Sequence, residues 1–541
     1  MRKFLSNLTQ HTPFLIFITI IFFYIFYPFH YEEGGISADA VFDAQIARNI
    51  LLGDGLGWQA TLQPPFHAIL TSAVYPLTGS ILIGGILISK LMWWLLPIPV
   101  YILAKEMFGT KIGLTSAILA FFHPHFSFSS GMMEPTVTYP TLLLFGICFM
   151  WHAFSKEKIF YAFLGGLFFT FSYLSRSEGL FIFLISLSVL LFIAFKDYFK
   201  TGAVHKRLLI IAVLIISFIL SSLPYILFLK DTYGKVVLSP KSTYVQTWMK
   251  WRIYHDNDLG ETGNPDLWGL SKNGKLMWQK PKGIGDLVRY LMSQPEKSLR
   301  VYLLNFSMQI PGRIPNNSGQ WLYPQVYPWY FVIPAFFWIA SRRRKEDWEK
   351  TIFLLSPFLI LFILPIFSEG WWKYLLPYSP FLIILGVAGV SDICERFRWK
   401  QLLPAFTVII AIYSLWTVKA SPLVKHGDKG VIARGSMLNE QIKAGKWAQK
   451  RFKGIQNYMV QWSKLTYYLN GRWIAKPVTT YDGMIWYARK NRVDYIVIET
   501  SGRDESEEII RIMGNTADLE VADVYESTTS SYSVVFLRLR K

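Results

Sequence analysis

The sequence contains a series of apolar runs that are each about as long as a lipid bilayer is thick. We count about eleven, several of them shorter than the ~20 residues of an ideal spanning helix. Only 17% of the residues are charged, whereas an average soluble chain is about a quarter charged. The sequence therefore predicts an α-helical polytopic membrane protein. The runs lie near residues 12–30, 81–104, 111–128, 136–154, 158–174, 179–196, 208–229, 327–341, 351–367, 375–391 and 402–419.

The first run follows a basic start at residues 1–3 and has the outline of a secretory signal peptide. It is longer than the apolar region of a typical signal peptide. Tyr24, Tyr27 and Pro28 also stand where small residues would mark a cleavage site. We interpret this run as a span that the protein retains.

The net charge of +19 is distributed by topology and does not indicate a nucleic-acid ligand. With the N-terminus in the cytoplasm, the loops on that side carry 18 of the 55 Lys and Arg residues. The three short loops on the other side, 123–135, 175–178 and 368–374, carry two. This asymmetry follows the positive-inside rule. It predicts a multi-pass protein of the plasma (inner) membrane whose large segments are extracytoplasmic.

We expect two domains. Residues 1–420 form the multi-spanning domain, with external loops at 31–80 and 230–326, and residues 421–541 form a small extracytoplasmic α/β domain. In loop 31–80 the short apolar stretches predict amphipathic helices lying at the membrane surface. In the C-terminal domain we expect helices at 437–452, 481–491 and about 504–513, and strands at 493–498, 519–526 and 531–540.

Two carboxylates open the first external loop. A helix is predicted after Ser37, a good N-cap, and it ends at Gly53. Asp39 and Asp43 are four residues apart and share a face that continues into apolar residues, so both acids are expected to point toward packing. Carboxylates in such a place need a metal, a cation or a shared proton. The alternative for Asp39 is that it only complements the helix dipole.

A second external acid, Glu134, lies directly before an apolar run, with His123 and His125 upstream. A glutamate with two histidines nearby is a possible metal site, but the spacing matches no specific metal motif. The alternative is that the histidines lie at a packing interface. Glu134 itself is the stronger candidate for an active-site acid.

Three basic residues stand where topology does not require them. Arg176 and Lys373 are lone cations in short external loops, and Lys90 lies inside the run 81–104. An intramembrane lysine is a functional-site hypothesis by default. The alternatives are snorkelling for Arg176 and Lys373 and a structural ion pair for Lys90.

Several short external segments occur in a fixed order along residues 1–420. They are Asp39 with the helix after it, Gly53-Asp54-Gly55, Pro64-Pro65-Phe66, Glu134-Pro135, Ser175-Arg176-Ser177-Glu178-Gly179 and Trp372-Lys373-Tyr374-Leu375-Leu376-Pro377-Tyr378-Ser379-Pro380. In order and sidedness they resemble the motifs of the GT-C glycosyltransferases. The likeness is to the branch containing protein O-mannosyltransferases and the lipid A aminoarabinose transferase.

The chain also departs from that pattern. Asp43 stands where an aromatic residue is common, and Lys373 stands where arginine is usual. Trp371-Trp372 is followed by Lys373, so the Trp-Trp-Asp signature of oligosaccharyltransferase catalytic subunits is missing from the sequence. This difference argues against en bloc transfer of an N-glycan.

The resemblance implies a glycosyltransferase that moves a hexose or pentose from a polyprenyl-phosphate-linked donor, with inversion, on the external face. The acceptor would be a hydroxyl of a lipid, a glycan or a protein. A positioned base is needed, for which Asp39 is the candidate, with Glu134 as its acidic partner. Lys373, Arg176 and Lys90 are the candidates for binding the donor phosphate.

Accessory roles, a metal and rival functions complete the expectations. Asp43, Arg48, His67 and Tyr374 are possible accessory residues, and Asp39 with Glu134 is a possible site for Mg, Mn or Zn. Aromatic residues of 230–326, including Tyr244, Trp248 and Trp251, either stack on sugars or mark a membrane interface. The main rival function is a polytopic transporter or lipid flippase, although no related halves are detected. A non-catalytic scaffold is a third possibility.

Overall fold

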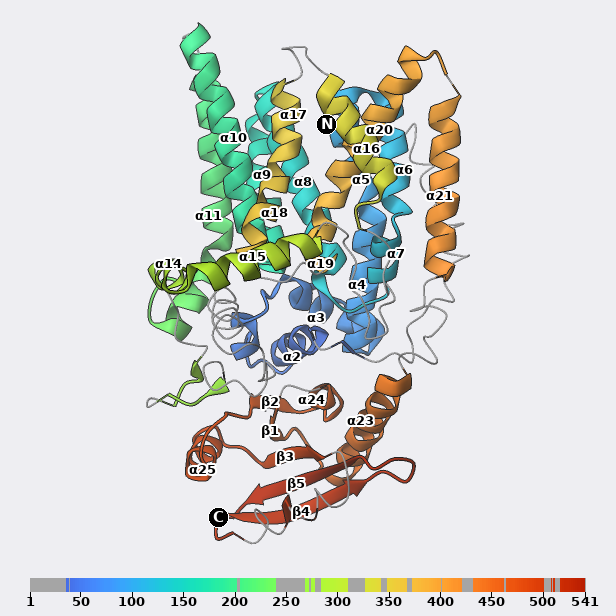
Figure 1. Cartoon of the computed structure of the whole chain (residues 1–541). Coiled ribbons are helices and arrows are strands. Elements are labelled where there is room, and N and C mark those ends of the chain that lie inside the picture. Colours follow the sequence, from blue (N-terminus) through green and yellow to red (C-terminus); the bar gives the residue numbers. More distant parts are fainter. Residues whose placement is uncertain are drawn as a thin grey trace.

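The computed structural model places a bundle of long helices at one end and a small sheet domain at the other (Figure 1). It describes residues 36–37, 39–201, 205–239, 268–271, 274–277, 284–309, 326–341, 348–366, 372–399, 401–420, 432–461, 464–500, 507, 509–510 and 516–540. The predicted first span, the aromatic residues Tyr244, Trp248 and Trp251, and most of the predicted helix at 504–513 lie outside these residues.

Each predicted span that falls on described residues has its helix. Within this part of the chain, six helical segments are long and apolar enough to cross a membrane, and four apolar helices are shorter. The bundle consists of α4 (Ile81–Leu95), α5 (Pro97–Phe108), α6 (Thr110–Phe121), α8 (Pro135–Lys156), α9 (Ile159–Ser175), α10 (Glu178–Thr201), α11 (His205–Tyr233), α16 (Trp329–Ser341), α17 (Trp348–Leu355), α18 (Ile360–Ile363), α20 (Ser379–Arg396) and α21 (Leu402–Ala420). The predicted polytopic helical fold is confirmed.

Burial separates central helices from peripheral ones. Helices α8 and α20 are the most buried of the candidate spans. In contrast, α10 and α11 expose large apolar side chains such as Phe192, Phe199 and Leu220. Exposed apolar surface on this scale suits contact with lipid.

Prolines divide two of the predicted runs. The run 111–128 is not one helix, because α6 ends at Phe121 and a separate helix, α7 (Pro124–Ser129), begins at Pro124. Helical backbone geometry is disfavoured for a residue that precedes proline, and the backbone of His123, directly before Pro124, is extended. The run 351–367 is likewise divided into α17, α18 and short 3-10 turns around Pro357 and Pro365.

Helices α2 (Ala40–Leu51) and α3 (Phe66–Thr78) lie between the bundle and the sheet domain (Figure 1). The expectation of an amphipathic helix with one buried face is wrong for α2. Residues 40–49 of α2 are all buried, so the helix is enclosed on every side instead of burying one face. Helices α14 (Ile284–Ser293), α15 (Pro295–Gln309) and α19 (Trp372–Leu375) lie at the same end of the bundle (Figure 1).

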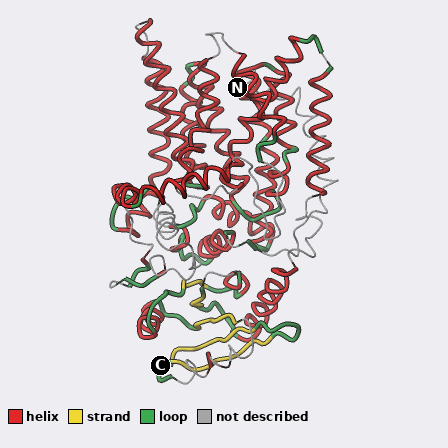
Figure 2. Tube along the Cα trace, viewed as in Figure 1, coloured by secondary structure: helices red, strands yellow, loops and turns green. Residues whose placement is uncertain are grey.

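The C-terminal domain contains a five-stranded sheet with strand order β2-β1-β3-β5-β4 (Figure 1). Figure 2 shows the strands of this sheet in yellow, apart from the helical bundle. Strands β1 (Asn457–Val460), β2 (Arg472–Ala475) and β3 (Tyr495–Thr500) are parallel, and β5 (Ser533–Leu539) pairs antiparallel with both β3 and β4 (Leu519–Glu526). Helices α23 (Ile432–Arg451), α24 (Leu465–Tyr468) and α25 (Tyr481–Lys490) complete it. The expected small α/β domain is therefore present. The expected domain boundary near 420–421 adjoins residues 421–431, which the structure does not describe.

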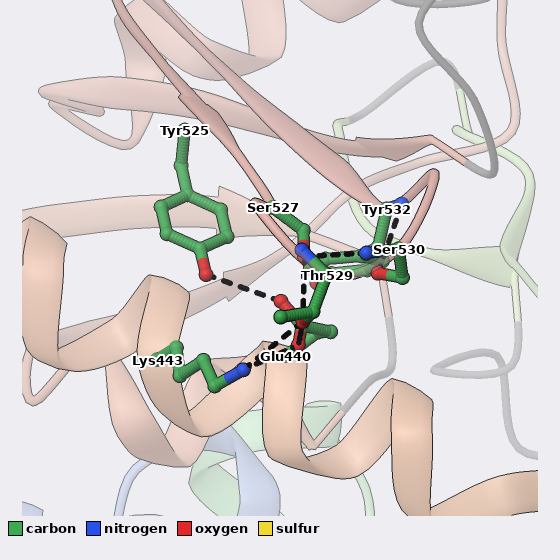
Figure 3. Close-up of polar contacts among 7 residues, drawn as sticks. All are labelled: Glu440, Lys443, Tyr525, Ser527, Thr529, Ser530 and Tyr532. Carbon is green, nitrogen blue, oxygen red and sulfur yellow. Dashed lines mark hydrogen bonds and ion pairs between the residues drawn. The ribbon is translucent and has the colours of Figure 1, made fainter.

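A buried carboxylate holds the β4–β5 hairpin on α23 (Figure 3). Glu440 of α23 accepts hydrogen bonds from Lys443 (2.8 Å), the Thr529 hydroxyl (3.0 Å) and the Tyr525 hydroxyl (3.2 Å). Burial by itself raises the pKa of Glu440, but hydrogen bonds from Lys443, Ser527 and Thr529 outweigh it and lower the pKa to about 2. The hairpin is thus attached through an ionised side chain.

Candidate functional site

The ammonium of Lys373 lies between two carboxylates at the end of the bundle that faces the C-terminal domain. Its Nζ is 2.7 Å from Oε2 of Glu134 and 3.1 Å from Oδ2 of Asp39. Three residues that the sequence singled out separately, and that are up to 334 positions apart, therefore meet. Their side chains form the candidate active site.

Each of the three is placed by a helix end. Asp39 directly precedes α2, and the Ser37 hydroxyl accepts a hydrogen bond from the backbone N–H of Ala40 (3.1 Å) at the start of that helix. Glu134 directly precedes α8, whose first residue is Pro135. Proline is favoured at this position because its missing N–H has no helical partner to lose. Lys373 lies in the one-turn helix α19.

The two carboxylates differ sharply in exposure. The Asp39 side chain is 53% exposed, whereas that of Glu134 is 2% exposed. Glu134 also accepts a hydrogen bond from the Ser37 hydroxyl and another from the Thr136 hydroxyl (3.0 Å). The buried Glu134 carboxylate thus holds Lys373 in place, while the Asp39 carboxylate is open to solvent.

The shared-face argument for the two aspartates holds for only one of them. Asp43 is completely buried, as a carboxylate pointing into packing should be. Asp39 is exposed instead, because it stands before the first helical turn and is not part of the helical face. The expectation that both side chains point into the packing is wrong for Asp39.

Arg176 lies beside the same short segment as Lys373. Its guanidinium is 4.8 Å from the ring centroid of Tyr374 and 6.0 Å from that of Tyr139, and it pairs with Glu178 at 2.9 Å. Burial by itself lowers the pKa of Arg176, but the Glu178 carboxylate more than offsets this and holds the pKa above its ordinary value. Tyr374, predicted as an accessory residue, therefore contacts Arg176 and directly follows Lys373, two of the three predicted phosphate-binding cations.

Two predicted residues make contacts elsewhere. Arg48 donates to the backbone carbonyls of Tyr467 (3.1 Å) and Gly471 (3.2 Å) in the C-terminal domain. Nδ1 of His67 is 3.0 Å from the Thr138 hydroxyl, and burial lowers the pKa of His67 to about 3. His67 is therefore neutral at ordinary pH and joins α3 to α8.

The remaining candidates are Lys90 and the two histidines. Lys90 is half-buried in α4, next to Ser89, whose hydroxyl donates to the backbone carbonyl of Glu134 (3.2 Å). His123 and His125 are buried with ring centroids 5.9 Å apart, and Nε2 of His123 is 3.2 Å from the carbonyl oxygen of Val326. This arrangement agrees with the interface alternative for the histidines.

The Lys373 ammonium occupies the position between Asp39 and Glu134 where a divalent cation was predicted. The Lys373 ammonium is already within hydrogen-bonding distance of both carboxylates, and a second positive charge beside it would be repelled. Among the described residues, no three His, Cys, Asp or Glu side chains gather into a possible metal site. Metal binding by Asp39 and Glu134 therefore stays a prediction, and a metal ion would have to compete with the Lys373 ammonium for the two carboxylates.

Three hydroxyl groups beside the carboxylates were not predicted as part of the site. Ser37 was expected only as a helix cap, and Thr136 and Ser89 were not singled out. Thr136 lies two residues after Glu134, so its proximity was available as a signal. Ser89 reaches the site only through the packing of α4 on α8.

Comparison with solved structures identifies the fold. The ArnT of Cupriavidus metallidurans bound to undecaprenyl phosphate is 12% identical with a TM-score of 0.54, and the alignment covers 98% of both chains. The oligosaccharyltransferase AglB of Archaeoglobus fulgidus, in complex with an inhibitory peptide and a dolichol-phosphate, is 15% identical with a TM-score of 0.54. That alignment covers 86% of this chain, which spans 65% of the length of AglB.

The chain thus has the fold of the GT-C superfamily of membrane glycosyltransferases, as the order of its motifs predicts. Residues 62–223 match the family described as dolichyl-phosphate-mannose-protein mannosyltransferase. This segment contains Glu134 and Arg176, whereas Asp39 and Lys373 lie outside it. The comparison with curated protein sequences finds no match.

Proposed function

We propose that this protein is an integral-membrane glycosyltransferase that moves a sugar from a polyprenyl-phosphate-linked donor to an acceptor hydroxyl, with inversion. The observation that carries the proposal is the meeting of Asp39, Lys373 and Glu134 at one end of a GT-C bundle. The polyprenyl phosphates bound to the neighbouring structures of ArnT and AglB support the donor class.

Asp39 is the proposed general base. Its exposed carboxylate takes the proton from the acceptor hydroxyl, and the acceptor oxygen forms a bond to the anomeric carbon. The bond from that carbon to the phosphate oxygen breaks on the opposite face, so a single displacement inverts the configuration. General base catalysis typically contributes about 10²–10⁴-fold.

Lys373 and Arg176 are the proposed cations for the departing polyprenyl phosphate. An ammonium has three N–H donors, of which the two carboxylates at Lys373 use two. The remaining donor is available to a phosphate oxygen, while Glu134 keeps the side chain aimed at the site. Arg176 adds a planar guanidinium, which matches phosphate geometry.

The pairing of Lys373 with Asp39 puts the proposed cation beside the proposed base. A donor phosphate held by the third N–H of Lys373 would therefore lie close to the carboxylate that receives the proton.

We propose that Lys373, and not a divalent cation, supplies the fixed positive charge at the two carboxylates. Treating the purified protein with a chelator should then change transfer by no more than about twofold. A larger loss that Mg²⁺, Mn²⁺ or Zn²⁺ restores would show that a metal displaces the ammonium. A structure of the Archaeoglobus fulgidus oligosaccharyltransferase in complex with Zn and sulfate makes this test worthwhile.

The site is proposed to face the extracytoplasmic side. The support is the distribution of basic residues, since the short loops that carry Arg176 and Lys373 are otherwise poor in positive charge. The plasma (inner) membrane is the proposed location, and a lipid, glycan or protein is the acceptor.

The test is transfer of a labelled sugar from synthetic polyprenyl-phosphate sugars by the purified protein, followed by determination of the anomeric configuration of the product. We expect transfer with inversion for at least one donor. A product of retained configuration would contradict the single displacement. Failure with every such donor, together with donor transport in vesicles, would favour the transporter or flippase reading instead.

A further inference from the structure

The C-terminal domain contacts the loop that carries Asp39 on both sides of that residue. Upstream, the backbone N–H of Ile36 donates to the Tyr468 hydroxyl (3.2 Å). Downstream, the Gln45 side chain donates to the backbone carbonyl of Thr466 (3.2 Å). The proposed base therefore lies between two points of attachment to one short segment of the sheet domain.

Arg48 provides a buried polar attachment with two hydrogen bonds. Its NH1 and NH2 groups donate to the carbonyls of Gly471 (3.2 Å) and Tyr467 (3.1 Å), and its guanidinium is 5.6 Å from the Tyr467 ring centroid. Burial lowers the pKa of Arg48 to about 10, which leaves it charged at neutral pH. Removing the Arg48 guanidinium would leave the two carbonyls in the interface without these donors, and a buried acceptor without a donor lowers the stability of the folded state.

Apolar packing makes the same interface continuous. The carbonyl of Trp473 accepts hydrogen bonds from the Trp58 and Gln59 side chains, both at 3.2 Å. The Trp473 ring lies 4.9 Å from the ring of Trp58 and 5.2 Å from that of Phe42, centroid to centroid. Buried residues of α2 and of the sheet belong to one hydrophobic cluster. These contacts are those expected of a sheet domain that stays attached to α2, and not of a lid that opens and closes.

We infer that the C-terminal domain is a fixed part of the transferase site and that Arg48 is the positioning residue through which it sets the location of Asp39. The inference rests on the proposed function for its catalytic consequence. Arg48 does not touch the carboxylates; it fixes α2, and α2 begins directly after Asp39. A small displacement of a catalytic group lowers the rate far more than it weakens substrate binding.

The first experiment measures how firmly Arg48 holds α2 on the C-terminal domain, without an activity assay. Hydrogen–deuterium exchange of the α2 amides is compared in the full-length wild-type protein, Arg48→Gln and Arg48→Lys. Arg472→Gln is the matched control, because Arg472 pairs with Asp54 (2.6 Å) at the same interface but is 41% exposed. We expect exchange to rise at least about tenfold in Arg48→Gln and less than about threefold in the control.

The second experiment measures sugar transfer by the same variants, normalised to the folded fraction. For Arg48→Gln we expect kcat to fall at least about tenfold while the donor KM stays within about threefold, since Lys373 and Arg176 are unchanged. Arg48→Lys, which keeps the charge but has all its N–H donors on one nitrogen, should recover part of kcat. Arg472→Gln should behave like the wild type.

If hydrogen exchange of the α2 amides is unchanged in Arg48→Gln, the inference that Arg48 fixes α2 is wrong. If exchange increases but kcat is unchanged, the inference that this fixation positions Asp39 for catalysis is wrong. A parallel loss of kcat and rise of donor KM points to general damage and also counts against positioning. If the wild-type protein transfers no sugar from any polyprenyl-phosphate donor, the proposed function fails, while the exchange result still decides whether Arg48 fixes α2.

Discussion

Replacing Lys373 by methionine should leave two carboxylates facing each other across the site. Both acids lie within 3.1 Å of the lysine nitrogen, so their oxygens are no more than about 6 Å apart. Methionine has a similar length and no charge. The variant therefore removes the cation with little change in packing volume.

The size of the effect follows from burial. Removing one partner of a buried ion pair costs about 3–5 kcal/mol, and Glu134 is buried enough for that range to apply. Two like charges about 6 Å apart add a repulsion of about 3 kcal/mol at an effective dielectric constant of 20. The exposure of Asp39 screens much of this repulsion. We expect Lys373→Met to lower the free energy of unfolding by about 3 kcal/mol.

A double-mutant cycle separates the charge from the packing. Glu134→Gln removes the buried charge, so the double variant Lys373→Met/Glu134→Gln should be less destabilised than the sum of the single variants by about 2 kcal/mol. The measurement is denaturant unfolding of the purified protein in detergent micelles. The matched control is Lys206→Met, because Lys206 is 80% exposed and 3.9 Å from Glu157. It should change stability by less than about 0.5 kcal/mol.

The reasoning would be refuted by additivity. If the two single effects add within about 0.5 kcal/mol, Lys373 and Glu134 are not coupled as the structure places them. A loss of stability in Lys373→Met no larger than in Lys206→Met would refute it equally.

Three further predictions concern Arg176, Ser37 and a buried carboxylate of the C-terminal domain. Arg176→Gln should raise the donor KM about tenfold with a smaller effect on kcat in steady-state assays, and an unchanged KM would remove Arg176 from phosphate binding. Ser37→Ala should lower the free energy of unfolding by about 1 kcal/mol and reduce kcat, because the hydroxyl accepts from the Ala40 N–H at the start of α2 and donates to Glu134. In the C-terminal domain, the folded pKa of Glu440 lies below its ordinary value of 4.5, so its stabilising contribution is present above about pH 5 and is lost toward about pH 2. Hydrogen exchange of β4 and β5 measures the difference in stability between the wild type and Glu440→Gln. This difference should become smaller as the pH falls from about 5 to about 2. A difference that does not change with pH would contradict a stabilising, ionised Glu440.

The sequence predicted the bundle well because membrane insertion depends on local hydropathy, which a single chain displays directly. It failed where prolines interrupt an apolar run, as before Pro124. Strands β1 and β2 were missed because each has only four residues, too few to establish an alternating pattern.

The candidate site was predictable in membership but not in roles. The sequence predicted that one side of the membrane carries Asp39, Glu134 and Lys373. Loops on the same side of a helical bundle can meet, so this prediction was enough to group the three residues. Which carboxylate is exposed depends on packing around Glu134, which no local pattern encodes. Arg48 was expected beside the site, but its partners lie 419 and 423 residues away in a domain whose docking the sequence does not reveal.

The central claim is that Asp39 accepts the proton of an acceptor hydroxyl during transfer from a polyprenyl-phosphate sugar. The direct measurement is sugar transfer at saturating donor by the purified wild-type protein and by Asp39→Asn, with donor binding measured separately. The asparagine variant should bind the donor and lose at least about 100-fold in kcat. Transfer by Asp39→Asn at the wild-type rate would contradict the account.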